Sequence, residues 1–118
     1  MNHNHNIRTS LMLSVIAATF SFTFPVEAFA VDAEAAKALA RQNNCFKCHS
    51  VEKKKDGPSY RDVAAKYKGK SDAESRLITH ITTGEKAKFP DGHEEDHKII
   101  KTKDMVQIKN LVNWILAQ

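Results

Sequence analysis

The chain has 118 residues, which is enough for one small domain and too few for two. Its 18 Lys and Arg against 14 Asp and Glu give a net charge of +4, and 42% of its residues are hydrophobic, a composition typical of soluble globular proteins. The counts of 4 Gly and 3 Pro argue against a turn-rich β-sandwich or barrel. With only 2 Cys, a multi-disulfide scaffold and a four-cysteine zinc site are excluded.

Residues 1–30 have the pattern of a secretory signal peptide. Arg8 precedes an apolar run over 11–24, and residues 28–30 read Ala-Phe-Ala, the small-residue pattern of a cleavage site. An apolar run of this length is too short to span a bilayer comfortably. We therefore expect cleavage after residue 30, export to the periplasm, and a mature domain over residues 31–118 that does not span the membrane.

The mature part of the chain has the pattern of an all-α protein. Four helices are expected: from the N-cap Asp32 to about Gln42, from Pro58 to Gly69, from a capping box at 71–74 to Gly84, and from the N-cap Asp104 to the end of the last apolar stripe. That stripe recurs at helical spacing and consists of Ile108, Leu111, Val112 and Ile115. Strand patterns are nearly absent. Residues 84–103 carry no apolar period, so we expect a long loop with a functional role there.

The segment Cys45-Phe46-Lys47-Cys48-His49 reads C-x-x-C-H. Two thiols at this spacing can add to the two vinyl groups of one haem, because the intervening residues let a single turn of chain reach both. The histidine that follows the second cysteine is then placed as the proximal ligand of the iron. The segment therefore predicts one covalently attached haem c, held by Cys45, Cys48 and His49.

Other roles for the two cysteines lead to different expectations. A thioredoxin-like redox pair needs a βαβ setting, which the pattern lacks. Two alternatives remain: a zinc site formed by Cys45, Cys48, His93 and His97, and a plain disulfide, which would close a loop too small to stabilise the fold much.

The sequence over 45–66, with C-F-K-C-H-S-V followed by G-P-S-Y-R-D-V-A-A-K-Y, resembles the small class I monohaem cytochromes c of bacterial periplasms. The resemblance continues to Ile81 and resumes over 108–116, so it covers most of the mature chain. It implies about four helices around one haem, with the first and last helices crossing. It also implies that the Pro58 carbonyl accepts a hydrogen bond from the Nδ1–H of His49.

The chain departs from this family at the distal side of the iron. The family places a methionine there, in the loop before the last helix, but the mature chain has only Met105, directly after the helix cap. The loop instead carries His93 and His97. The family ligand lies about sixteen residues before the Trp of the last helix, and His97 lies 17 before Trp114. We expect His49 and His97 to bind the iron, with His93, Met105, His80 or an open site as alternatives.

A haem with both axial positions filled leaves none for a substrate, so we expect a one-electron carrier and not an enzyme. Six lysines near the haem segments could dock an acidic face of redox partner proteins: Lys47, Lys53, Lys54, Lys55, Lys86 and Lys88. The alternative function is a haem protein that binds or senses nitric oxide or carbon monoxide, or a small haem subunit of a redox complex. Nucleic-acid binding is not expected, because the basic residues are interleaved with acidic ones.

Overall fold

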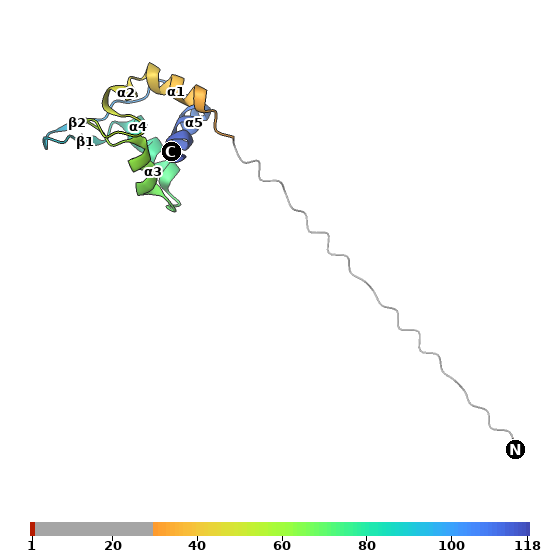
Figure 1. Cartoon of the computed structure of the whole chain (residues 1–118). Helices are drawn as coiled ribbons and strands as arrows, with labels where there is room; N and C mark the ends of the chain where they lie inside the picture. The colour runs from red at the N-terminus through yellow and green to blue at the C-terminus, as the bar shows by residue number, and fades with distance from the viewer. Residues whose placement is uncertain (2–29) are drawn as a thin grey trace.

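The computed structural model of the chain describes residue 1 and residues 30–118 (Figure 1). The described part contains five helices and one antiparallel two-stranded sheet: α1 (Ala33–Gln42), α2 (Cys45–Cys48), α3 (Tyr60–Tyr67), α4 (Ala73–Thr83), β1 (Lys86–Lys88), β2 (Glu94–Asp96) and α5 (Met105–Leu116). The expected helical architecture is confirmed, with a small hairpin added. The apolar run of the expected signal peptide lies outside the described residues, and within them no helix is both long and apolar enough to cross a bilayer.

The first and last helices lie side by side and are joined by a pair of hydrogen bonds (Figure 1). The backbone N–H of Asp32 donates to Asn110 Oδ1, and Asn110 Nδ2 donates to the Asp32 carbonyl, both at 2.8 Å. The Asp32 carboxylate also accepts from the backbone N–H of Ala35 and so caps α1, as expected. Asn110 is buried within an otherwise apolar helix face, and no periodicity argument could assign it this role.

A single apolar core connects α1, α3, α4 and α5. Its buried members are Ala36, Leu39, Ala40, Tyr60, Leu77, Ile100, Ile108, Leu111, Val112, Trp114 and Ile115. Leu39 of α1 belongs to the same cluster as Leu111, Trp114 and Ile115 of α5, so the expected crossing of these helices is confirmed. This is a small number of large side chains, and domains of this size usually need a further source of stability.

Helix α4 begins differently from the prediction. Its N-cap is Asp72, whose side chain makes no capping hydrogen bond, while Ser75 Oγ donates to the Asp72 carbonyl at 2.9 Å. The Glu74 carboxylate accepts from Asn113 Nδ2 of α5 at 2.9 Å. The predicted capping box at 71–74 is therefore wrong, because the helix has Asp72 and not Ser71 as its N-cap and the Glu74 side chain contacts α5 instead of the cap.

The other helix ends lie where the sequence predicts them. Gly69 and Gly84 have φ angles of +74° and +72°, the left-handed conformation that ends a helix and favours glycine. The Asp104 carboxylate accepts from the backbone N–H groups of Val106 and Gln107. The Gln107 amide donates to Asp104 Oδ2 at 3.2 Å, so these two side chains bind one another directly.

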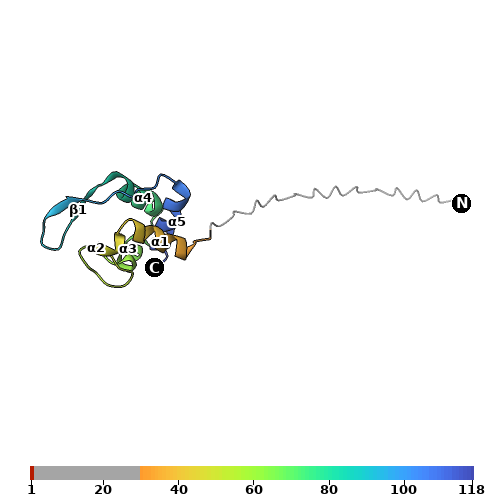
Figure 2. The ribbon, with the colours of Figure 1, turned by 90° about the horizontal axis from the view of Figure 1, so that it is seen from above.

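Residues 84–103 contain the β1–β2 hairpin, so the expectation of a structureless loop is wrong. The paired positions are Lys86 with Asp96, Ala87 with Glu95 and Lys88 with Glu94. Opposite charges thus face each other across the strands, and the Lys86 ammonium lies 2.6 Å from the Asp96 carboxylate. Apolar alternation, the usual strand signal, is absent from both strands. Figures 1 and 2 show the hairpin projecting from the helical body beside α4.

Candidate functional site

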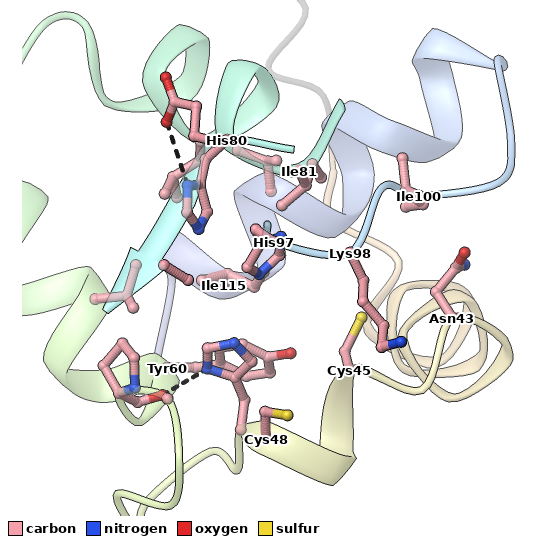
Figure 3. Close-up of a pocket in the computed structure, with 18 of the residues that line it drawn as sticks. Asn43, Cys45, Cys48, Tyr60, His80, Ile81, His97, Lys98, Ile100 and Ile115 are labelled. Carbon is pink, nitrogen blue, oxygen red and sulfur yellow. Dashed lines mark hydrogen bonds and ion pairs between the residues drawn. The ribbon is translucent and has the colours of Figure 1, made fainter. Parts of the chain in front are cut away.

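A cavity of about 560 Å³ opens beside the core and is lined by parts of α2, α3, α4, the hairpin and α5. This volume lies within the usual range for small-molecule and cofactor sites. Cys45 and Cys48 line it together with His80 and His97, which come from α4 and from the segment after β2 (Figure 3). The cavity therefore brings the cysteine motif and the loop before α5 to one place.

Helix α2 is a single turn that carries both cysteines. Residues three apart in a helix lie on the same side, so both thiols can face one ligand. Asn44, just before α2, has a φ of 57° and turns the chain sharply out of α1, in a conformation that Asn tolerates better than most residues. Burial raises the pKa of the Cys45 thiol, whereas redox-active C-x-x-C pairs have a lowered one.

His49 follows α2 directly, and its ring is held from several sides. Its Nδ1–H donates to the Pro58 carbonyl at 2.8 Å, the contact that the family resemblance implies. This hydrogen bond sets the tautomer and leaves Nε2 with a free lone pair. The chain before Pro58 is fixed too, because the backbone N–H of Gly57 donates to the Cys48 carbonyl at 2.8 Å.

Gly57 lies directly against the His49 ring. A Cβ at this position would come within 2.7 Å of His49 Nδ1 and 2.9 Å of Nε2, and closer still to Cε1. Such distances are too short for any side chain to fit without moving the ring. The absence of a side chain at residue 57 is therefore what allows the imidazole to reach Pro58.

His97 lies half-buried across the cavity from His49, with 6.1 Å between the two ring centres. Its Nδ1 is buried and has no hydrogen-bond partner in the structure. Burial, followed by the nearby His80 and His49, lowers the pKa of His97 to about 4. The imidazole is therefore neutral at physiological pH, the form that binds metals.

The spacing of these rings fits two ligands on one metal ion. An imidazole nitrogen binds a transition metal at about 2 Å and the ring centre lies about 1 Å behind it, so two imidazoles on opposite sides of one ion have ring centres about 6 Å apart. His49 and His97 match this spacing at 6.1 Å. The rings of His80 and His97 have centres only 4.2 Å apart, so they do not match two ligands on opposite sides of one ion.

His93 does not line the cavity. It is exposed at the end of the hairpin, where its ring stacks on Phe89 with 4.4 Å between centres. Its Nδ1 contacts the Asp91 carboxylate and its Nε2 lies 3.3 Å from Glu95 Oε1. The hydrogen bond to Asp91 is the main reason that the pKa of His93 is raised.

Two alternatives from the sequence lose their support from this arrangement. The zinc site needs His93 beside both cysteines, and within residues 30–118 no three His, Cys, Asp or Glu side chains are grouped closely enough to hold a metal ion. Met105 is the first residue of α5, is 48% exposed, and is not among the residues of the described part that line the cavity.

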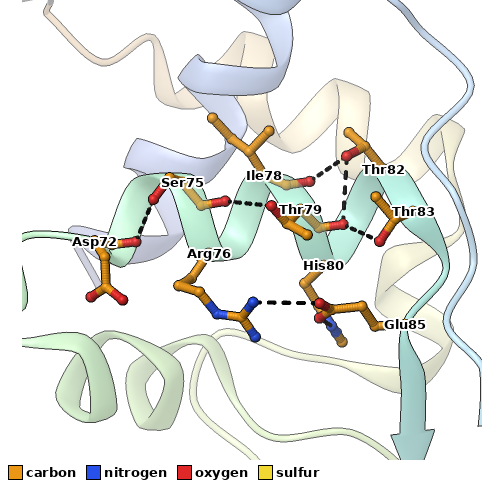
Figure 4. A network of polar contacts seen from close by, with 9 residues as sticks. All are labelled: Asp72, Ser75, Arg76, Ile78, Thr79, His80, Thr82, Thr83 and Glu85. Carbon is orange, nitrogen blue, oxygen red and sulfur yellow. Dashed lines mark hydrogen bonds and ion pairs between the residues drawn. The ribbon is translucent and has the colours of Figure 1, made fainter.

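A polar group at the end of α4 supports the cavity and has no counterpart among the site residues expected from the sequence. Glu85, just after α4, lies 3.3 Å from His80 Nδ1 and 3.4 Å from Arg76 Nη1 (Figure 4). The His80 ring in turn lies against His97. The i, i+4 spacing of Arg76 and His80 places both on one helix face, but no sequence signal identifies Glu85 as the residue that joins them.

The fold and the cavity define a small helical protein built around a C-x-x-C-H cofactor site. Residues 33–118 match the family model described as "Cytochrome c", and the chain belongs to the cytochrome c family. It is 38% identical over 79 residues to "Cytochrome c-551" of Allochromatium vinosum, covering 67% of this chain and 81% of that protein. It is also 38% identical over 85 residues to "Cytochrome c-552" of Nitrosomonas europaea, covering 72% and 80%.

Solved structures agree with these sequence matches. The crystal structure of the class 1 cytochrome MtoD from Sideroxydans lithotrophicus ES-1 is 68% identical, with a TM-score of 0.72, and the match covers 75% of this chain and 97% of that one. Cytochrome c552 of Nitrosomonas europaea superimposes with a TM-score of 0.56 at 34% identity, over 69% and 96% of the two chains. The prediction of a small class I cytochrome c is confirmed, and with it one haem c bound covalently through Cys45 and Cys48.

The close approach of Gly57 to His49 gives a specific test. Gly57→Ala should push the His49 ring away from the Pro58 carbonyl, lower the free energy of unfolding by about 1–3 kcal/mol, and weaken the low-spin absorption spectrum of the haem-loaded protein. Chemical denaturation and visible spectroscopy measure the two effects.

Gly69→Ala is the matched control for this test. Its φ is +74° and nothing lies within 4 Å of an added Cβ, so it should lose stability through backbone strain alone and keep its spectrum. An unchanged spectrum in Gly57→Ala would show that residue 57 does not constrain the ring.

Proposed function

We propose that this chain is a periplasmic one-electron carrier whose single haem is bound by His49 on one side and His97 on the other. The observation that supports it most strongly is the 6.1 Å spacing of these two rings across one cavity. When bound, haem c supplies a centre that accepts and releases one electron. The signal-peptide pattern of residues 1–30 supports export, and the mature protein is proposed to comprise residues 31–118.

The chain's own residues explain how such a centre is held. The Pro58 carbonyl accepts from His49 Nδ1–H, and so increases the electron density on the nitrogen that faces the cavity. His97 is kept neutral by burial and can bind through its lone pair. Since methionine ligation raises the potential of a haem, two imidazole ligands give a lower potential than the His/Met pair usual in this family.

Replacement of each loop histidine tests the ligand assignment. His97→Ala should turn the ferric spectrum from low-spin to high-spin and allow fast binding of carbon monoxide to the reduced protein. His93→Ala should change neither, because the His93 ring lies outside the cavity and is engaged by Asp91 and Glu95. Absorption spectroscopy with and without carbon monoxide measures both.

The opposite behaviour of the two variants would show that His93 is the ligand. If only Met105→Ala changed the spectrum, Met105 would be the ligand. Fast carbon monoxide binding by the unmodified protein would favour the ligand-binding function instead of the carrier.

The proposed partner surface is the lysine-rich edge of the cavity at Cys45. Lys47 is exposed within α2, and Lys55 Nζ donates to the Phe46 carbonyl at 2.6 Å. Lys98 lines the cavity and extends toward Cys45 (Figure 3), and the backbone N–H of Lys101 donates to Asn43 Oδ1 at 2.9 Å. Positive charge from three chain segments thus surrounds one edge of the site, which favours an acidic redox partner.

Two of the six lysines expected at this surface are less suited to docking. Lys86 and Lys88 lie on the hairpin opposite acidic residues, and Lys86 is paired with Asp96. Their charges are thereby partly neutralised locally, so we assign the docking role to the lysines around Cys45.

A charged small oxidant tests this surface without a known partner. Oxidation of the reduced protein by ferricyanide should slow as ionic strength rises, and Lys47→Glu combined with Lys101→Glu should slow it several-fold at low salt. Stopped-flow absorption measures the rate.

Lys109→Glu, which changes one charge on α5 away from the cavity lining, should have a small effect. An equal loss in the logarithm of the rate for each charge reversed would show that net charge alone governs the rate.

A further inference from the structure

Tyr60, the first residue of α3, is buried against the cysteine motif and has no part in the function proposed above. Only 4% of the residue is exposed, although it lines the cavity. Tyr60 is the tyrosine of the G-P-S-Y pattern on which the family resemblance rests, but the resemblance gives this tyrosine no role. The contacts of the side chain show what it does.

The face of the Tyr60 ring lies against the ring of His49. The two ring centres are 5.5 Å apart and the planes are inclined by only 17°, so the rings are nearly parallel. A stacked neighbour of this kind resists rotation of the imidazole out of its plane, because rotation would force the two ring surfaces into contact or open a gap.

Tyr60 can act as a fixed surface because its own ring and backbone are restrained. The ring meets Trp114 edge-on at 5.5 Å and Phe46 at 6.0 Å. Its backbone N–H donates to the Ser50 carbonyl at 2.9 Å, which fixes the start of α3 against the segment that follows His49. The hydroxyl group lies beside the Cys45 side chain, so one residue touches both ends of the C-x-x-C-H motif.

A second restraint on His49 is needed for a geometric reason. The hydrogen bond from Nδ1 to the Pro58 carbonyl fixes the direction of one ring atom. A single hydrogen bond has a broad angular range, so it limits rotation of the ring about its Cβ–Cγ bond only in part. The parallel face of Tyr60 restricts that rotation.

We propose that Tyr60 is a positioning residue that sets the plane of the His49 imidazole relative to the haem. The inference rests on the proposed function, since it takes His49 as a ligand of the iron. The plane of a bound imidazole decides which iron orbitals overlap with the ring. It therefore controls how the unpaired electron of the ferric state is distributed over the porphyrin, and groups around a metal ligand commonly tune a centre in this way.

Three variants of the haem-loaded protein separate this role from packing. Tyr60→Leu removes the stacked ring, Tyr60→Phe keeps the ring and removes the hydroxyl, and Leu39→Ala removes a buried core side chain that does not line the cavity. The readout is the proton NMR spectrum of the ferric protein, in which the order of the four haem methyl resonances depends on the direction of the axial imidazole planes.

Tyr60→Leu should change the order of the methyl resonances, whereas Tyr60→Phe and Leu39→Ala should keep the wild-type order even if Leu39→Ala costs more stability. The proposal is overturned if Tyr60→Leu keeps the wild-type order, or if Leu39→Ala changes it to the same extent.

A measurement on the unmodified protein decides the matter if Tyr60→Leu does not fold. In the reduced, diamagnetic state, the ring protons of Tyr60 and His49 should show a nuclear Overhauser contact, and its absence would overturn the proposal.

The spin state of the wild-type protein distinguishes failure of the proposed function from failure of the role of Tyr60. A wild-type ferric protein that is high-spin contradicts the ligand pair, whereas a low-spin wild type with an unresponsive Tyr60→Leu variant contradicts only the role of Tyr60.

Discussion

The structure depends on the opposed positions of two imidazoles, His49 and His97, across one cavity. Each lies on a different part of the chain: His49 follows the single turn α2, and His97 follows the strand β2. Their ring centres are 6.1 Å apart, the spacing expected for two imidazoles on opposite sides of one metal ion. The hairpin, the loop before α5 and the segment around Pro58 can all be understood as the means by which these two rings reach the same place.

The same constraint explains why so small a domain is built with a large cavity. About 560 Å³ is left beside a core of few large side chains, and several of those side chains, including Leu111, Val112 and Ile115, line it. An empty volume of this size would be costly, because cavities destabilise proteins roughly in proportion to their volume. In a cytochrome c the haem fills that space, so the cofactor is at once the redox centre and a large part of the core.

Much of the fold and the cysteine side of the site could be predicted from the sequence. The signals that carried these predictions are local: helical periodicity, caps such as Asp32 and Asp104, and the C-x-x-C-H spacing. They involve residues close together in the sequence, so the rest of the fold does not change them. The prediction of a capping box at 71–74 was wrong because the N-cap is Asp72 and not Ser71, while Glu74 contacts α5, which lies far along the sequence. The hairpin was missed because its pairing depends on opposite charges across the strands and not on apolar alternation.

The sequence reduced the candidates for the distal ligand to a few residues but did not identify which of them faces the cavity. The count of residues from Trp114 favoured His97, but the loop also carries His93, and no sequence signal shows that His93 lies at the end of the hairpin while His97 lines the cavity. The contacts of Gly57, Tyr60 and Glu85 could not be predicted from the sequence either. Each contact joins segments whose relative position only the fold determines.

The absorption spectrum of the purified ferric protein at neutral pH distinguishes the possible ligand pairs in a single measurement, since it reports both axial ligands at once. Ligation by His49 and His97 predicts a low-spin spectrum that lacks the weak far-red charge-transfer band of a methionine–iron bond. A high-spin spectrum, or a low-spin spectrum that contains that band, would exclude this pair of ligands.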